Sequence, residues 1–165
     1  PLKEVPIWLA AGGPKSSHLA AEFADGLMIS VKNPEDAYER VINPATIKTD
    51  ELEKSKLRVH TYRWTMFAEN DDDAWESLKS WRGLRAPNRL QEIDPQALRE
   101  QADALPKDEI MSKFSRAGTI DELVDIYSPL VDDFGSEIVT IQKSSVNQEE
   151  TIKLLGKELL PRLKK

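Results

Sequence analysis

Cysteine is absent from this chain of 165 residues, and histidine occurs only twice. The absence of cysteine excludes disulfide-stabilised scaffolds, cysteine-ligated zinc and iron–sulfur clusters. It also suits a reducing compartment, so we expect a cytoplasmic protein. Long apolar runs are missing as well, since none approaches the roughly 20 residues that a membrane-spanning helix needs. The sequence therefore predicts no membrane partner.

Acidic residues outnumber basic ones, with 29 Asp and Glu against 23 Lys and Arg and a formal net charge of −6. This balance is unlike the basic surface that binds nucleic acid, so we expect no nucleic-acid partner. A chain of this length is long enough to bury one sizeable core. It begins with Pro1 rather than Met, and we expect it to continue a longer chain or to be a processed product.

Short apolar runs alternate with amphipathic segments along the chain. The expected strands cover residues 6–11, 27–31, 57–67 and 137–142. The expected helices cover 16–24, 119–134 and 147–163, and two more begin at 33 and at 71. Strands that alternate with helices predict a parallel sheet with crossover helices, and hence the α/β class.

The segment from about 83 to 118 differs from this alternation. Three prolines, Pro87, Pro95 and Pro106, divide it into short pieces, and 95–105 and 107–116 have helical patterns. We expect a helical insertion without a strand. Four βα units fit either a doubly wound four-stranded sheet or half of a (β/α)8 TIM barrel, which needs about eight strands to close. The insertion favours the half barrel, because functional insertions in barrels lie in the loops beyond the strands.

A glycine loop follows the first expected strand. Gly12, Gly13 and Pro14 stand between that strand and a helix. Glycines allow a ligand close to the backbone, and a helix N-terminus favours an anion. The loop is therefore either a phosphate- or cofactor-binding loop or simply a tight turn.

Cations gather near the insertion, and one stands just beyond the second strand. These residues are Lys32, Arg82, Arg85, Arg89, Lys113 and Arg116. Guanidinium and ammonium groups that converge would suit a phosphate ester or another anion. The same residues could equally be scattered surface charge, and spacing alone leaves both interpretations open.

Metal and nucleophile signatures are missing. His18 and His60 lie far apart without a paired acid, and the acidic run Asp71–Asp73 is typical of the start of a helix. We expect no metal site. Four tryptophans fit core and loop packing, and Trp64 is of most interest because it lies on an expected barrel strand.

Two groups of motifs resemble a known family. The run Ala10–Pro14, the Leu-Ala helix and then Ala24-Asp25-Gly26 before a strand resemble the luciferase-like flavin and deazaflavin superfamily of (β/α)8 barrels. The segments Ala102–Pro106, Thr119–Val124 and Leu160–Leu163 are similar to the F420-dependent glucose-6-phosphate dehydrogenase group. The resemblance implies that residues 1–165 form the C-terminal half of such a barrel.

The resemblance also implies site residues. In that family the loop matched by Ala10, Ala11, Gly12 and Gly13 contacts coenzyme F420, and the alternative cofactor is FMN. A hydroxyl residue at the substrate site corresponds to Ser30, and two of three cations for the sugar phosphate correspond to Arg89 and Lys113. Asn33 stands at the position of the third cation, one residue after Lys32. At this position the chain therefore departs from the family's pattern for binding glucose 6-phosphate.

The family's catalytic residues lie in the first half of the barrel, and neither histidine of this chain matches them. We therefore expect no catalytic residue in this half, no activity of the chain alone, and an N-terminal half as its partner in an intact homodimer. The implied reaction is hydride transfer from a sugar phosphate or alcohol to the deazaflavin. An FMN-dependent monooxygenase or a methylenetetrahydromethanopterin reductase on the same barrel stays open, as does a non-catalytic half barrel that binds a partner.

Overall fold

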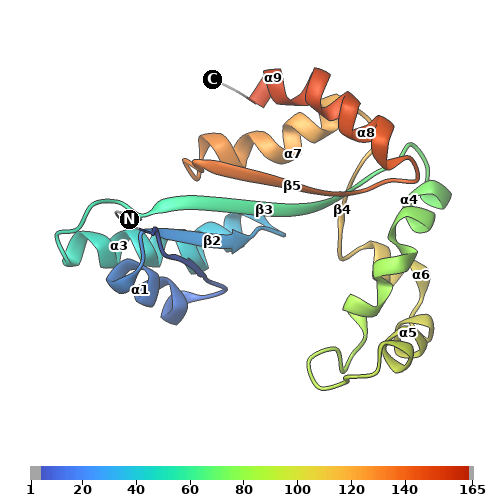
Figure 1. The fold of residues 1–165 in the computed structure, drawn as a ribbon, viewed down its shortest axis with the longest axis horizontal. Coiled ribbons are helices and arrows are strands. Elements are labelled where there is room, and N and C mark those ends of the chain that lie inside the picture. The colour runs from blue at the N-terminus through green and yellow to red at the C-terminus, as the bar shows by residue number, and fades with distance from the viewer. Residues whose placement is uncertain (1–4, 164–165) are drawn as a thin grey trace. The chain divides into compact units, whose positions relative to one another are not determined.

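A computed structural model describes residues 5–163 of the chain (Figure 1). It consists of two compact units. The first unit comprises Pro1–Arg63 and Asp125–Gln142, and the second comprises Trp64–Val124 and Lys143–Lys165. Three elements run from one unit into the other: strand β3 (Arg58–Phe67), helix α7 (Ile120–Asp132) and strand β5 (Ile138–Ser144).

The first unit is a parallel sheet with helices. Its remaining elements are β1 (Trp8–Ala10), α1 (Pro14–Phe23), β2 (Gly26–Ser30), α2 (Pro34–Ala37), the π-helical turn η1 (Tyr38–Ile42) and α3 (Asn43–Glu51). Strand β2 pairs in parallel with β1 and with β3, and β5 also pairs with β3. Helices α1 and α3 pack together on one side of β1 and β2 (Figure 1).

The two faces of this sheet differ in burial because side chains alternate along a strand. Leu27 and Ile29 of β2 are buried against the helices, at 1% and 2% exposure. The opposite face carries Met28 of β2 and, in register with it, Ala10 of β1 and His60 of β3. Met28 and His60 are only half-buried, and Ala10 is exposed. The apolar core of this unit therefore lies on the helical side alone.

Local sequence signals decide where the first helices begin. Pro14 occupies the first turn of α1, where a missing N–H costs nothing. Asn33 caps α2 by accepting a hydrogen bond from the Asp36 N–H at 3.2 Å, and Pro34 follows it. The start of α2 confirms the sequence expectation, whereas α1 begins at Pro14 rather than at the expected residue 16.

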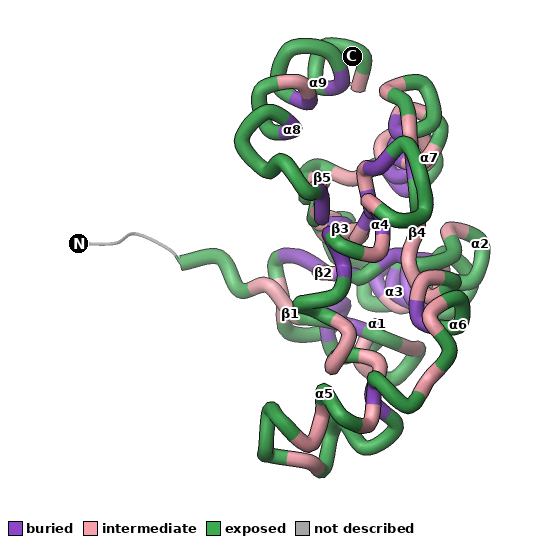
Figure 2. The backbone as a smooth tube through the Cα atoms, turned by 90° about the vertical axis from the view of Figure 1, so that its right-hand side faces the viewer, coloured by how far each residue is buried: buried purple, intermediate pink, exposed green. Residues whose placement is uncertain are grey.

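The second unit begins with the end of β3. Its other elements are α4 (Asp71–Leu78), the 3-10 helix η2 (Lys79–Arg85), α5 (Pro95–Asp103), α6 (Lys107–Met111), β4 (Ser115–Ala117), α8 (Gln148–Leu154), the π-helical turn η3 (Leu155–Leu159) and α9 (Leu160–Leu163). Asn70 caps α4 at the Asp73 N–H, which confirms the acidic run as a helix start. Met66, Leu78 and Ile110 form part of the buried core. Helix α5 buries only Ala102 and is otherwise exposed or half-buried (Figure 2).

The insertion holds a strand that the sequence did not reveal. The expected helix over 107–116 ends at Met111, and Ser115–Ala117 forms β4, paired in parallel with β3 from Thr65 to Phe67. The expectation of no strand there was wrong. The three residues Ser115, Arg116 and Ala117 contain no apolar run, so only pairing with β3 makes them a strand. The α/β class is confirmed, and each of the four expected strand segments holds a strand, although β1 spans only Trp8–Ala10 of the expected 6–11.

Candidate functional site

A pocket of about 420 Å³ lies in the first unit, where β1 and β2 end. The residues that line it include Ala10, Ala11, Gly12, Ser30, Lys32 and Arg40. Carboxyl ends of neighbouring parallel strands meet at one edge of a sheet, which is where α/β proteins bind ligands. The structure thus brings together five of the eight residues that the sequence singled out.

Hydrogen bonds hold the glycine loop at the rim of this pocket. The Ala11 N–H donates to the Met28 carbonyl oxygen at 2.9 Å, which ties the loop to β2. The Gly12 N–H donates to Ser16 Oγ at 3.2 Å, and the Ser16 and Ser17 hydroxyls each donate to the Gly13 carbonyl oxygen at 2.9 Å. Gly13 therefore starts α1, whereas Gly12 faces the pocket.

Gly12 leaves the pocket open. A Cβ atom built on it would meet nothing within 4 Å, so a side chain there would project into empty space rather than into the protein. Ala10, Ala11 and Gly12 together offer a floor with almost no side-chain bulk. A flat ring such as a deazaflavin fits a floor of this kind, and the residues present are compatible with that group.

Polar and charged groups line the rest of the pocket. Ser30 is exposed at the end of β2 and stands in register with Tyr62 of β3, which also lines the pocket. Arg40 of η1 reaches back to the loop, where its Nη2 donates to the Gly12 carbonyl oxygen at 3.4 Å, and its Nη1 lies 3.4 Å from Asp36 Oδ2. Lys32 is exposed. The side-chain oxygen of Asn33, in contrast, is taken up by its capping bond.

A separate, smaller cavity of about 120 Å³ lies in the second unit. It is lined by Arg85, Arg89, Leu105, Glu109, Ile110 and Lys113. Two of these, Arg89 and Lys113, are sequence-predicted site residues, and the structure brings them together. Burial lowers the pKa of Arg85, and the positive charge of Arg89 lowers it further. This cavity is a concentrated positive site.

The other cations of the insertion serve structural roles. Arg82 is ion-paired to Asp103: its Nε donates to Oδ1, and its Nη2 donates to Oδ2 at 2.9 Å. Arg116 donates to the Ala68 and Glu69 carbonyl oxygens at 3.3 and 3.0 Å and is ion-paired to Asp71. Neither lines the cavity, so the five cations near the insertion separate into three that line the cavity, Arg85, Arg89 and Lys113, and two with structural roles.

The two histidines lie in separate surroundings. His18 is exposed on α1, and His60 Nε2 lies 2.8 Å from Thr140 Oγ1 with its ring edge-on to Trp8. Within residues 5–163, no three His, Asp or Glu residues cluster as metal ligands would. In the same stretch, no helix has the length and apolarity to cross a membrane.

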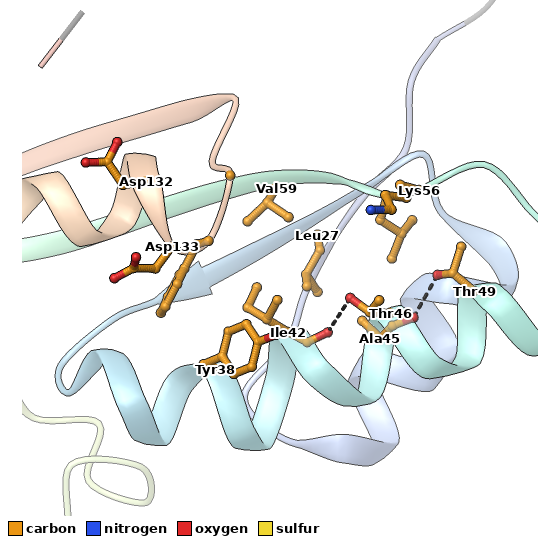
Figure 3. A pocket seen from close by; sticks show the side chains of 13 residues that line it. Leu27, Tyr38, Ile42, Ala45, Thr46, Thr49, Lys56, Val59, Asp132 and Asp133 are labelled. Atoms are coloured by element: carbon orange, nitrogen blue, oxygen red, sulfur yellow. Dashed lines mark hydrogen bonds between the residues drawn. The ribbon is translucent and has the colours of Figure 1, made fainter. Parts of the chain in front are cut away.

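Another hollow, of about 380 Å³, lies on the helical side of the first unit, between η1–α3 and the strands (Figure 3). Leu27 and Val59 project toward it from β2 and β3 (Figure 3). Its threonine hydroxyls are satisfied within their own helix, Thr46 by Ile42 at 3.0 Å and Thr49 by Ala45 at 2.7 Å. We assign it to helix packing.

Sequence reasoning missed Arg40 and Tyr62 as pocket residues. Arg40 stands one turn after Asp36 in a helix that begins at the pocket edge, and that i,i+4 pair was visible in the sequence. Tyr62 had no such signal, because its place depends on the register of β3 against β2.

Comparison with known proteins gives the family. The family model described as luciferase-like monooxygenase matches residues 1–133. An F420-dependent glucose-6-phosphate dehydrogenase of Microbacterium testaceum (strain StLB037) is 27% identical over 170 residues, which cover 100% of this chain and 50% of that protein. A 5,10-methylenetetrahydromethanopterin reductase of Methanolobus tindarius is 27% identical over 177 residues, which cover 95% and 54%. The chain thus spans about half the length of these relatives.

Solved structures agree on the fold. An F420-dependent secondary alcohol dehydrogenase in complex with an F420-acetone adduct superposes with a TM-score of 0.81 at 23% identity, over 100% of this chain and 51% of the other. The fold is that of half a (β/α)8 barrel, and the resemblance to the F420-dependent glucose-6-phosphate dehydrogenase group is confirmed. With the family model matching most of its length, this chain belongs to the luciferase-like monooxygenase family.

Proposed function

We propose that this chain is the C-terminal half of a coenzyme F420-dependent oxidoreductase that acts on a sugar phosphate or an alcohol. The observation that carries the proposal is the pocket floor of Ala10, Ala11 and Gly12. It is supported by relatives that are named F420-dependent glucose-6-phosphate dehydrogenases. The cofactor, when bound, would exchange a hydride with the substrate carbon.

The residues of this half bind and orient. Ala10, Ala11 and Gly12 form the surface on which the ring would lie, with Gly13 holding the loop at α1. The Ser30 hydroxyl lines the same pocket and would hydrogen-bond a substrate oxygen. Arg89 and Lys113 neutralise a substrate anion, and Lys32 adds a positive charge to the pocket in the first unit. A base on another part of the protein takes the hydroxyl proton.

The uncovered face of the sheet supports the proposal that an N-terminal half of the barrel packs against this chain. Trp8, Met28 and His60 are half-buried on the side opposite the helices. The inward face of a closed barrel is filled by side chains from all eight strands. An N-terminal half would cover these side chains, and we extend the proposal to a homodimer of the intact protein in the cytoplasm, with the 165-residue chain inactive alone.

The test is separate titration of the intact protein with F420 and with FMN, followed by turnover with glucose 6-phosphate and with a secondary alcohol. We expect tight binding of F420 only, and F420 reduction with one of the two substrates. Tight binding of FMN instead would move the protein to the FMN-dependent monooxygenases. Binding of neither would overturn the oxidoreductase proposal and favour a non-catalytic half barrel, which sedimentation should then find as an oligomer because open sheet edges associate.

A second candidate substrate is methylenetetrahydromethanopterin. The Methanolobus tindarius relative favours it. Asn33 favours it too, because it stands where the glucose-6-phosphate dehydrogenases have a cation, and its side chain caps a helix instead. Turnover of methylenetetrahydromethanopterin without turnover of glucose 6-phosphate would identify the protein as the reductase.

A further inference from the structure

Two residues with hydroxyl groups stand opposite each other in the pocket of the first unit. Ser30 of β2 and Tyr62 of β3 are paired in register, and both line this pocket. Paired residues on neighbouring strands lie about 5 Å apart and project to the same face of the sheet. That face is the one away from the buried Leu27 and Ile29, because side chains alternate along β2. The two hydroxyl groups therefore belong to one wall of the pocket.

The backbone fixes the place of this pair. The Val31 N–H, directly after Ser30, donates to the Tyr62 carbonyl oxygen at 2.9 Å, and Val31 is buried at 2% exposure. The Ala11 N–H ties the glycine loop to the Met28 carbonyl oxygen of the same strand β2. The wall and the floor of the pocket are thus parts of one hydrogen-bonded sheet, so the backbone of the pair is positioned before a ligand binds.

Tyr127 in the same unit shows how this fold treats a tyrosine that serves packing. It is fully buried on α7, and its hydroxyl donates to the Arg63 carbonyl oxygen at 2.9 Å. Tyr62 is half-buried, and neither its hydroxyl nor that of Ser30 makes a hydrogen bond to another residue within 5–163. A tyrosine hydroxyl that is taken out of water usually has a partner. Phenylalanine would fill the same space without leaving a polar group unpaired, so the Tyr62 hydroxyl is available for a ligand.

The chemistry of this wall selects a neutral ligand group. A hydroxyl both donates and accepts a hydrogen bond and carries no charge, so it matches another hydroxyl rather than a phosphate or a carboxylate. The phenol of Tyr62 also reaches farther from its backbone than the hydroxymethyl group of Ser30. Two hydroxyls at different depths contact two oxygens of a ligand more readily than a single one. A polyol or sugar offers neighbouring hydroxyls, whereas a simple alcohol has only one.

We infer that Tyr62 is a specificity-determining residue whose hydroxyl binds a second, non-reacting hydroxyl of the substrate, beside the oxygen bound by Ser30. The substrate class that it selects is a polyol or sugar rather than a simple alcohol. The inference rests on the proposed function, which gives the pocket floor to the cofactor and Ser30 to the substrate. A site that hydrogen-bonds a substrate hydroxyl discriminates against analogues without it, because the protein group is then left unpaired.

The test pairs removal of the protein hydroxyl with removal of each substrate hydroxyl. Wild type and Tyr62→Phe, as intact proteins, are compared on glucose 6-phosphate and on its monodeoxy analogues. For wild type, one analogue should have a KM about tenfold above that of glucose 6-phosphate. For Tyr62→Phe the same two KM values should agree within about twofold, with kcat and the Kd for F420 also within about twofold of wild type. Calorimetry on the F420-free protein measures the same ratio as binding alone.

Tyr38→Phe is the matched control. It removes the same hydroxyl from a tyrosine on η1 that is 40% exposed and does not line this pocket. Its discrimination among the analogues should equal that of wild type, and thermal melting should show that both variants are folded. Unchanged discrimination in Tyr62→Phe would overturn the role of Tyr62. Weakened affinity for F420 with that discrimination retained would also overturn it, because Tyr62 would then contact the cofactor.

Failure of the proposed function is seen separately. A wild type that binds F420 and reduces it with a secondary alcohol, but not with glucose 6-phosphate, would overturn the selection of a sugar and leave the oxidoreductase proposal standing. A wild type that does not bind F420 would overturn the oxidoreductase proposal itself, and the titration shows this before any substrate is added.

Discussion

The indole ring of Trp8 occupies the space into which a side chain on residue 26 would project. The two residues are paired in the register of β1 and β2, and a Cβ atom on Gly26 would overlap the six-membered part of the ring. The ring is held further by His60, edge-on at 6.0 Å, and by the Arg58 guanidinium at 5.0 Å. Glycine at 26 is therefore what lets the Trp8 ring lie over the start of β2.

Replacement of Gly26 should destabilise the protein. Gly26→Ala forces the Trp8 ring to move, and overpacking of this kind costs about 1–3 kcal/mol in the free energy of unfolding. Urea denaturation of the intact protein measures it. Gly156→Ala is the matched control, because a Cβ at this exposed helical residue meets nothing within 4 Å and should be neutral or stabilising by up to about 1 kcal/mol. Equal effects of the two substitutions would contradict the packing role.

Gly12→Ala should separate binding from stability. Its Cβ would stand in the open pocket, so the free energy of unfolding should change by no more than about 1 kcal/mol. Affinity for F420 should fall about tenfold, because the methyl group lifts a flat ring from the backbone. Fluorescence titration of the intact protein measures the affinity. Unchanged affinity would remove Gly12 from the proposed cofactor surface.

Loss of Arg89 should act on charged substrates. Arg89→Ala in the intact enzyme should raise KM for a phosphorylated substrate about tenfold, since it removes one of three cations from the small cavity. KM for an uncharged alcohol should stay within about twofold. Steady-state kinetics with both substrates measure these KM values. An equal rise in KM for the two substrates would contradict an anion-binding role for Arg89.

The Arg82–Asp103 pair should make the insertion sensitive to acid. Its hydrogen bond with Arg82 lowers the pKa of Asp103 below the usual ~3.9. A carboxyl whose folded pKa is depressed stabilises the protein above its unfolded pKa, and this is lost as pH falls through the folded value. The stability difference between wild type and Asp103→Asn should therefore be constant above about pH 5 and shrink below pH 4. A difference independent of pH down to pH 2 would show that the pair contributes nothing.

The elements with strong local signals were predictable, and the others were not. The apolar run around Leu27, the strand-like run 57–67, the cap Asn33 and the acidic run Asp71–Asp73 predict β2, β3, α2 and α4 from the sequence alone. Strand β4 lacks any such signal and exists because Ser115 pairs with Thr65. A short polar segment becomes a strand only through pairing with its neighbours, because its own residues have little intrinsic preference for the strand conformation.

The candidate sites follow the same division. The residues Ala10, Ala11, Gly12, Ser30 and Lys32 lie in one pocket because each closely follows or ends a strand, and parallel strands end at one edge. Arg82, Arg85 and Arg89 looked alike in the sequence. Only the structure shows that Arg82 is ion-paired to Asp103, whereas Arg85 stacks on Phe114 and lines a cavity with Arg89.

The sequence by itself determined the α/β class, the starts of α2 and α4, the glycine loop and the absence of cysteine chemistry. These depend on local periodicity, caps and composition, which act between residues close in the chain. The tertiary structure alone decided β4, the place of Tyr62 opposite Ser30, the need for glycine under Trp8, and the partners of each arginine. These depend on strand register and on packing between distant segments, which no short stretch of residues encodes.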